Sequence, residues 1–136
     1  MTRVLLVILT VTQTLQPAGV PQAATGSGER VAVGTGKQVS LDSGRLIIGL
    51  DAVISDSRCP AGYQCISAGE ARVRIWVEEG SGARQWRIIS GPGPVRYEVS
   101  ARHSLQMVSL EPKPEAGVRR QPQEYVATFI VTTNNC

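Results

Sequence analysis

The stretch DSRCPAGYQCISAGEARVRIWVEE, residues 56–79, is the most informative part of the sequence about the fold, because it joins a cysteine-bracketed turn to a regular strand. From Ala71 onward, apolar and polar residues alternate, which is typical of a β-strand with one buried face. The ten residues that open the stretch are instead rich in Cys, Pro and Gly, which favour turns. The stretch therefore predicts a strand that follows a short, constrained connection.

The segments on either side of this stretch predict further strands. Residues 45–55 are the most apolar part of the mature chain, and their β-branched side chains and Gly49 favour a strand over a helix. The apolar residues of this segment fall on both faces, as expected of a central strand or of a strand with a bulge. Gly80-Ser81-Gly82 predicts a hairpin turn, so Trp76 and Trp86 flank one hairpin, and the register decides whether they pair.

Shorter strands follow the same rules elsewhere in the chain. Candidate strands cover residues 30–33, 37–41, 83–90, 95–100, 105–110 and 125–131. The apolar phase slips between Met107 and Val108, which indicates a bulge. Short strands with turn signals between them predict an all-β protein, a small antiparallel β-sandwich or partly open barrel of about seven strands.

The N-terminal segment has the composition of a secretory signal peptide. Arg3 precedes the apolar run 4–11, and small residues around Ala23 and Ala24 suit cleavage. A membrane anchor is the alternative, but a span needs about 20 apolar residues, and Gln13 interrupts this run. With no cysteine nearby, lipid attachment there is excluded. We predict a signal peptide at 1–24, a single all-β domain at 25–136 and a secreted or periplasmic location.

Length and charge limit the function classes. A chain of 136 residues is long enough for one domain with a real core. It carries 14 basic and 11 acidic residues, a net charge of +3, and the charges are interspersed. Arg119-Arg120 is the only basic pair. Because nucleic-acid binding needs a concentrated basic face, we expect no nucleic-acid partner.

The three cysteines predict one disulfide. An exported chain can keep disulfides, and an odd count leaves at least one thiol unpaired within a monomer. Cys59 and Cys65 enclose five residues that a turn would bring together, whereas Cys136 is the last residue of the chain. The preferred pair is Cys59–Cys65 over either pairing with Cys136, and a disulfide-linked dimer through Cys136 is a further hypothesis.

The cysteine loop is the candidate site. Asp56 can accept backbone N–H bonds at the start of the turn, and an ion pair between Arg58 and Glu70 would clamp the loop base. The simplest interpretation is a stapled connection between two strands. Alternatively, Tyr63 and Gln64 form a recognition surface, because a rigid loop loses little entropy on binding. A redox role is weaker, since active dithiols usually have closer spacing.

The sequence contains no familiar catalytic or metal-binding pattern. His103 is the only histidine, and with Cys59 and Cys65 it would leave a zinc site one ligand short. No serine lies in a Gly-x-Ser-x-Gly turn, Glu78 and Glu79 alternate faces of a strand, and no glycine-rich loop precedes a helix. We therefore predict a protein that is not an enzyme and that uses no cofactor and no metal.

The block formed by residues 56–60, Cys65 and residues 68–71 resembles a family of largely uncharacterised small secreted proteins and lipoproteins of bacteria. Residues 110–112 and 125–127 also fit the family pattern. Members often carry Trp where this chain has Ser67, which argues against a functional requirement for Trp at that position in this chain. Members also lack the terminal Cys136. The resemblance implies a β fold and an envelope location, but no activity.

Together these features predict an exported, non-enzymatic binding or structural module of the bacterial envelope. Its partner would be an envelope or extracellular protein, and its mature chain would have no membrane span. One alternative is a small inhibitor that presents the Cys59–Cys65 loop to an enzyme. Another is an enzyme with an unfamiliar site.

Overall fold

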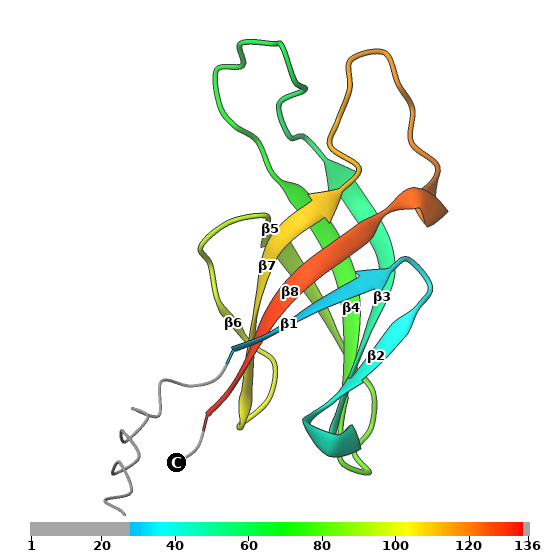
Figure 1. The fold of residues 1–136 in the computed structure, drawn as a ribbon, viewed down its shortest axis with the longest axis vertical. Coiled ribbons are helices and arrows are strands. Elements are labelled where there is room, and N and C mark those ends of the chain that lie inside the picture. Colours follow the sequence, from blue (N-terminus) through cyan, green and yellow to red (C-terminus); the bar gives the residue numbers. More distant parts are fainter. Residues whose placement is uncertain (1–27, 135–136) are drawn as a thin grey trace, which may run out of the picture.

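The computed structural model describes residues 28–134, which form two four-stranded antiparallel sheets that pack against each other (Figure 1). The predicted β-sandwich is confirmed, and the sheets do not close into a barrel. The predicted signal peptide at 1–24 and Cys136 lie outside the described residues. No helix in the described range is both long and apolar enough to cross a membrane.

The chain contributes its strands to the two sheets in alternating blocks. The first sheet has the order β1-β8-β7-β6 and the second has the order β2-β3-β4-β5. The strands are β1 (Gly28–Gly34), β2 (Gln38–Leu41), β3 (Leu46–Asp56), β4 (Ala71–Glu79), β5 (Gln85–Gly91), β6 (Tyr97–Glu98), β7 (His103–Glu111) and β8 (Val126–Thr133). Two short 3-10 turns, η1 (Asp42–Gly44) and η2 (Pro122–Glu124), precede β3 and β8.

The described residues contain eight strands, whereas the sequence pattern predicts about seven. The candidate strand at 95–100 shrinks to the two residues of β6, and Val95 stays exposed. The register of β7 against β8 shifts between Met107 and Ser109, which confirms the predicted bulge. The most apolar segment becomes β3, which lies inside its sheet between β2 and β4 and has two register shifts of its own.

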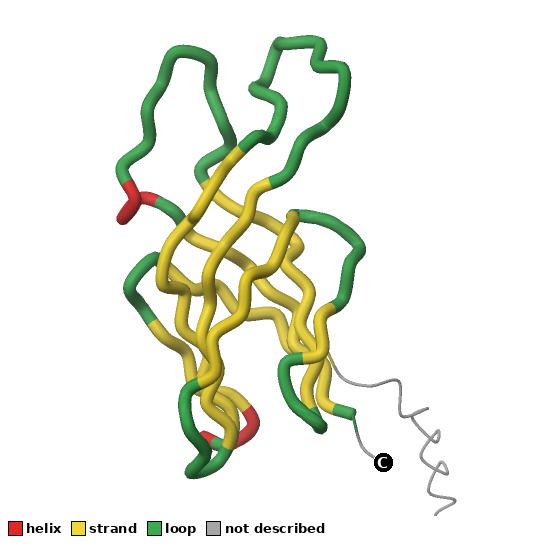
Figure 2. Tube along the Cα trace, turned by 180° about the vertical axis from the view of Figure 1, so that it is seen from behind, coloured by secondary structure: helices red, strands yellow, loops and turns green. Residues whose placement is uncertain are grey.

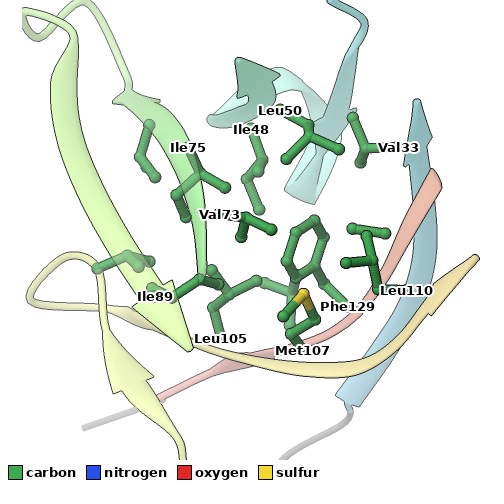
Figure 3. Packing of buried hydrophobic residues seen from close by; sticks show 14 of the residues in the cluster. Val33, Ile48, Leu50, Val73, Ile75, Ile89, Leu105, Met107, Leu110 and Phe129 are labelled. Atoms are coloured by element: carbon green, nitrogen blue, oxygen red, sulfur yellow. The ribbon is translucent and has the colours of Figure 1, made fainter. Parts of the chain in front are cut away.

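The core fills the space between the sheets. Alternate residues of each strand point inward, so that the apolar rows of both sheets meet. Figure 3 shows the ring of Phe129 among side chains from both sheets. The largest fully buried apolar side chains are Phe129, Leu46, Ile48, Leu50, Ile75, Ile89, Leu105, Met107 and Leu110.

The outer face of the second sheet carries the tryptophan pair. Trp76 lies directly opposite Trp86 in the β4–β5 register, so the two residues do pair across the hairpin. Trp76 is buried because its ring lies over Gly49, where a Cβ atom would fall 2.0 Å from Cε2 of the indole. The Arg84 guanidinium lies 3.6 Å from the centroid of the Trp76 ring, a cation–π arrangement.

Candidate functional site

The cysteine loop, residues 57–70, connects β3 to β4 at one end of the sandwich. A second loop, residues 112–121, connects β7 to η2 and projects from the same end. Figures 1 and 2 show the two loops beside each other, well beyond the ends of the strands. The backbone N–H of Ala61 donates to the carbonyl of Pro114 at 3.4 Å, so the loops also touch.

The base of the cysteine loop extends the β3–β4 ladder. Ser57 N–H donates to the Glu70 carbonyl at 2.9 Å, and Cys59 N–H donates to the Ala68 carbonyl at 3.0 Å. Gly69 is required between these two bonds because its φ is +65° and a Cβ atom would lie 1.8 Å from the Ser57 carbonyl oxygen. The loop therefore leaves the sandwich as a hairpin.

The tip of the loop is closed by a turn and a disulfide. Tyr63 N–H donates to the Pro60 carbonyl at 3.2 Å, and Gly62 has a φ of +83°. A positive φ at the third residue is what a type II turn requires. The predicted Cys59–Cys65 disulfide is present, with Cα atoms 5.9 Å apart. The disulfide and the turn together restrict the residues between the two cysteines.

Arg58 fastens the loop to the rest of the domain. Its guanidinium makes two hydrogen bonds of 2.8 Å to the carboxylate of Asp56, through Nε and Nη2. Nη1 also donates to the Leu110 carbonyl at 2.6 Å, and Nη2 donates to the Pro112 carbonyl at 3.1 Å. Arg58 thus joins the end of β3 to the segment that leaves β7.

The electrostatics of this clamp follow from its burial and its charges. Hydrogen bonds from Arg58 hold the pKa of the Asp56 carboxyl below its usual value of 3.8, because they stabilise the charged form. The carboxylate in return raises the pKa of Arg58. Burial raises the pKa of the Tyr125 phenol, whose hydroxyl lies 3.5 Å from Asp56 Oδ2.

The predicted ion pair between Arg58 and Glu70 does not form. Glu70 lies opposite Ser57 in the continued ladder, and directly opposite residues point to the same face. Arg58 points to the other face, which it shares with Asp56 because residues i and i+2 of an extended chain lie on one side. Glu70 therefore contributes its backbone to the loop base, while its side chain is exposed.

The predicted recognition residues lie at the tip and face solvent. Tyr63 is 63% exposed, and Gln64 is exposed beside it. Two further apolar residues, not predicted from the sequence, are exposed nearby: Ile66 is fully exposed on the same loop, and Val118 is 46% exposed on the neighbouring loop. An apolar residue immediately after Cys65 is a signal that could have identified Ile66.

His103 lies at the other end of the sandwich, in a contact that no sequence motif indicates. Its Nδ1 lies 3.1 Å from Ser100 Oγ and its Nε2 lies 3.3 Å from Asp42 Oδ2. The Ser100 hydroxyl oxygen also accepts the backbone N–H bonds of Arg102 and His103, and the imidazole is 1% exposed. The hydroxyl oxygen is thus occupied and the imidazole is shielded, which suits a structural contact and not a nucleophile with its base.

The cysteine loop is not positioned as a metal site. Among residues 28–134, no group of three or more His, Cys, Asp or Glu side chains is placed to hold a metal ion.

A comparison with models of known protein families found no match, and comparisons with curated proteins and with solved structures found none either.

Proposed function

We propose that the protein is an exported, non-enzymatic binding module of the bacterial envelope that recognises a partner protein with its cysteine loop. The observation that supports this proposal is the exposure of Tyr63 and Ile66 on a loop whose base is fixed. Large apolar side chains in solvent are common anchors of protein interfaces. Because the ladder, the disulfide and Arg58 already order the loop, little conformational entropy remains to be lost on binding.

The neighbouring loop enlarges the same surface. Val118 is exposed on it, and the contact between Ala61 and Pro114 keeps the two loops adjacent. Loops at one end of a β-sandwich are a common binding surface because the sheets hold them without taking part themselves. The shared surface favours a partner protein over a small ligand, since both loops project outward from the end of the sandwich.

The test is affinity capture from an envelope fraction with immobilised protein, followed by direct binding of each captured protein. The wild-type chain should retain a partner that a Tyr63→Ala/Gln64→Ala/Ile66→Ala variant loses. The matched control is Ile88→Ala, which removes another half-exposed apolar side chain from the outer face of β5. Equal capture by the loop variant and the wild-type protein would contradict the proposal.

A small inhibitor is the second candidate, and the same loop geometry favours it. A disulfide-closed loop that projects from a stable scaffold has the form needed to enter an enzyme cleft. If the captured partner is an enzyme, this candidate predicts that the wild-type protein lowers its activity and that the triple loop variant does not. A captured enzyme of unchanged activity would rule the inhibitor out and leave the binding module standing.

A further inference from the structure

The inward-facing rows of β4 and β5 become polar at the end of the sandwich opposite the cysteine loop. On β4 the row runs through Ile75 and Val77 and then reaches Glu79. On β5, Ile89 is buried, but Arg87 and Gln85, which face Ile75 and Val77 across the ladder, are exposed. Charged residues are unusual on the inner face of a sandwich, because such positions are normally apolar.

A cleft of about 490 Å³ lies where these polar residues end the core. It is bounded by the β4–β5 hairpin on one side and by the turn between β6 and β7 on the other, both at the bottom of Figure 1. Val77 and Val99 contribute buried apolar surface, and its polar lining includes Glu79, Gln85, Arg87 and Ser100. This volume lies in the range of small-molecule sites.

The cleft holds a cation and an anion that do not pair with each other. The Arg87 guanidinium donates to Gln85 Oε1 at 3.0 Å and to the Trp86 carbonyl at 3.1 Å. Among residues 28–134, no carboxylate lies within 4.0 Å of the Arg87 guanidinium, and the nearest ionisable partner of Glu79 is His103 Nδ1, at 3.7 Å. Arg87 lies opposite Ile75, which precedes Glu79 by four residues. The backbones of Arg87 and Glu79 are therefore separated by about 13 Å along the strand direction.

We propose that this cleft binds a small zwitterion, either a free α-amino acid or a short peptide. The ligand carboxylate accepts hydrogen bonds from the planar guanidinium of Arg87, which suits a bidentate contact. The ligand ammonium group donates to the carboxylate of Glu79, and the apolar part of the ligand lies against the exposed Ala83 and Ala101, which also line the cleft. A simple anion is disfavoured by Glu79 and by Glu98, which also lines the cleft, and a simple cation is disfavoured by Arg87.

A competing explanation assigns Arg87 a protective role. β5 is the edge strand of its sheet, and an inward-pointing charge on an edge strand discourages pairing with another chain. Protection accounts for Arg87 alone, whereas ligand binding also accounts for Glu79 and for the cleft between them. The two explanations differ in whether any zwitterion binds.

The test is a titration of the isotope-labelled protein with each common free amino acid, dialanine and trialanine, followed by the backbone amide resonances. We expect saturable shifts at amides of residues 77–87 and 98–101. Arg87→Gln should weaken binding about 10- to 100-fold, the effect of losing a charge-assisted contact, and Arg87→Lys should weaken it less. The matched control is Arg72→Gln on the outward face of β4, which should bind as the wild type does.

Blocked probes separate the two charges. An amino acid amide lacks the carboxylate, so it should bind the wild-type protein much more weakly than the free amino acid does, and Arg87→Gln should weaken its binding little further. An N-acetyl amino acid lacks the ammonium group and should show the same pattern with Glu79→Gln. The proposal is overturned if no probe shifts these amides at millimolar concentration, if the shifts lie elsewhere, or if Arg87→Gln binds as tightly as Arg72→Gln. The relative affinity of the amino acids and the peptides identifies the ligand.

Discussion

At the scale of single residues, Arg58 joins the cysteine loop to the rest of the domain through an ion pair that is largely buried. Its side chain is 11% exposed and that of Asp56 is 13% exposed, so water screens the pair little. The pair between Arg74 and Asp51, with exposures of 48% and 33%, is of the exposed kind that contributes under about 1 kcal/mol. Breaking a buried pair by removing one partner costs more, because a desolvated charge is left alone.

This environment predicts a pH dependence that can be traced to Asp56. Its pKa is lowered in the folded protein, so between that lowered value and 3.8 the unfolded chain binds a proton that the folded chain does not. Stability from Asp56 is therefore complete above about pH 5 and is lost as the pH falls below 3.8. Urea unfolding from pH 6 to pH 2 should show a smaller acid-induced loss for Asp56→Asn than for the wild-type protein. Equal losses would contradict this assignment.

At the scale of elements, the cysteine loop behaves as an extension of the β3–β4 hairpin. The ladder continues past Asp56 and Ala71 through two further backbone bonds, and the strand ends are therefore not the limits of regular structure. Gly62 and Gly69 are required in the loop for different reasons. Gly69 combines a positive φ with a close backbone approach, whereas Gly62 combines a positive φ with open space around its Cα.

This difference predicts unequal effects of two alanine substitutions. Gly62→Ala should cost about 1 kcal/mol, the price of a left-handed conformation at a residue with a Cβ atom. Gly69→Ala should cost about 2–4 kcal/mol, because the new Cβ would also collide with the Ser57 carbonyl and the ladder must open. Urea unfolding of the two variants measures the difference. Equal losses would show that the close approach at Gly69 relaxes without cost.

At the scale of the whole molecule, polar contacts connect the two sheets at both ends of the apolar core. Arg58 makes this connection beside the cysteine loop, and His103 of β7 makes it at the opposite end, to Asp42 in the turn between β2 and β3. Asp42 and Ser43 have φ values of +51° and +53°, a conformation that Asp tolerates better than most residues. The contact with His103 therefore holds a strained turn of one sheet against a strand of the other.

His103 is accordingly predicted to contribute to the stability of the entire domain. His103→Ala should lower the free energy of unfolding by about 2–4 kcal/mol, since it leaves a cavity and removes the partners of Asp42 and Ser100. The adjacent Arg102→Ala, whose side chain is exposed, should change stability by less than about 0.5 kcal/mol. Chemical denaturation with a single transition for both variants provides the comparison. A loss below about 1 kcal/mol for His103→Ala would mean that the sheets stay joined without it.

The class of fold and the local constraints follow from the order of residues along the chain. Alternation of apolar and polar residues identified β4, the phase slip identified the bulge of β7, and the spacing of Cys59 and Cys65 identified the disulfide. These features depend on residues that are close in the chain. A period of two and a short ring need no knowledge of distant segments.

Which charged groups meet depends instead on how distant segments pack. The choice of Asp56 over Glu70 as the partner of Arg58 depends on which face of a continued ladder each side chain occupies. The contact between His103 and Asp42 joins residues 61 positions apart, and the cleft with Arg87 exists because two hairpins from different sheets end side by side. Such contacts depend on register and on sheet packing, and neither is encoded by the period of a single strand.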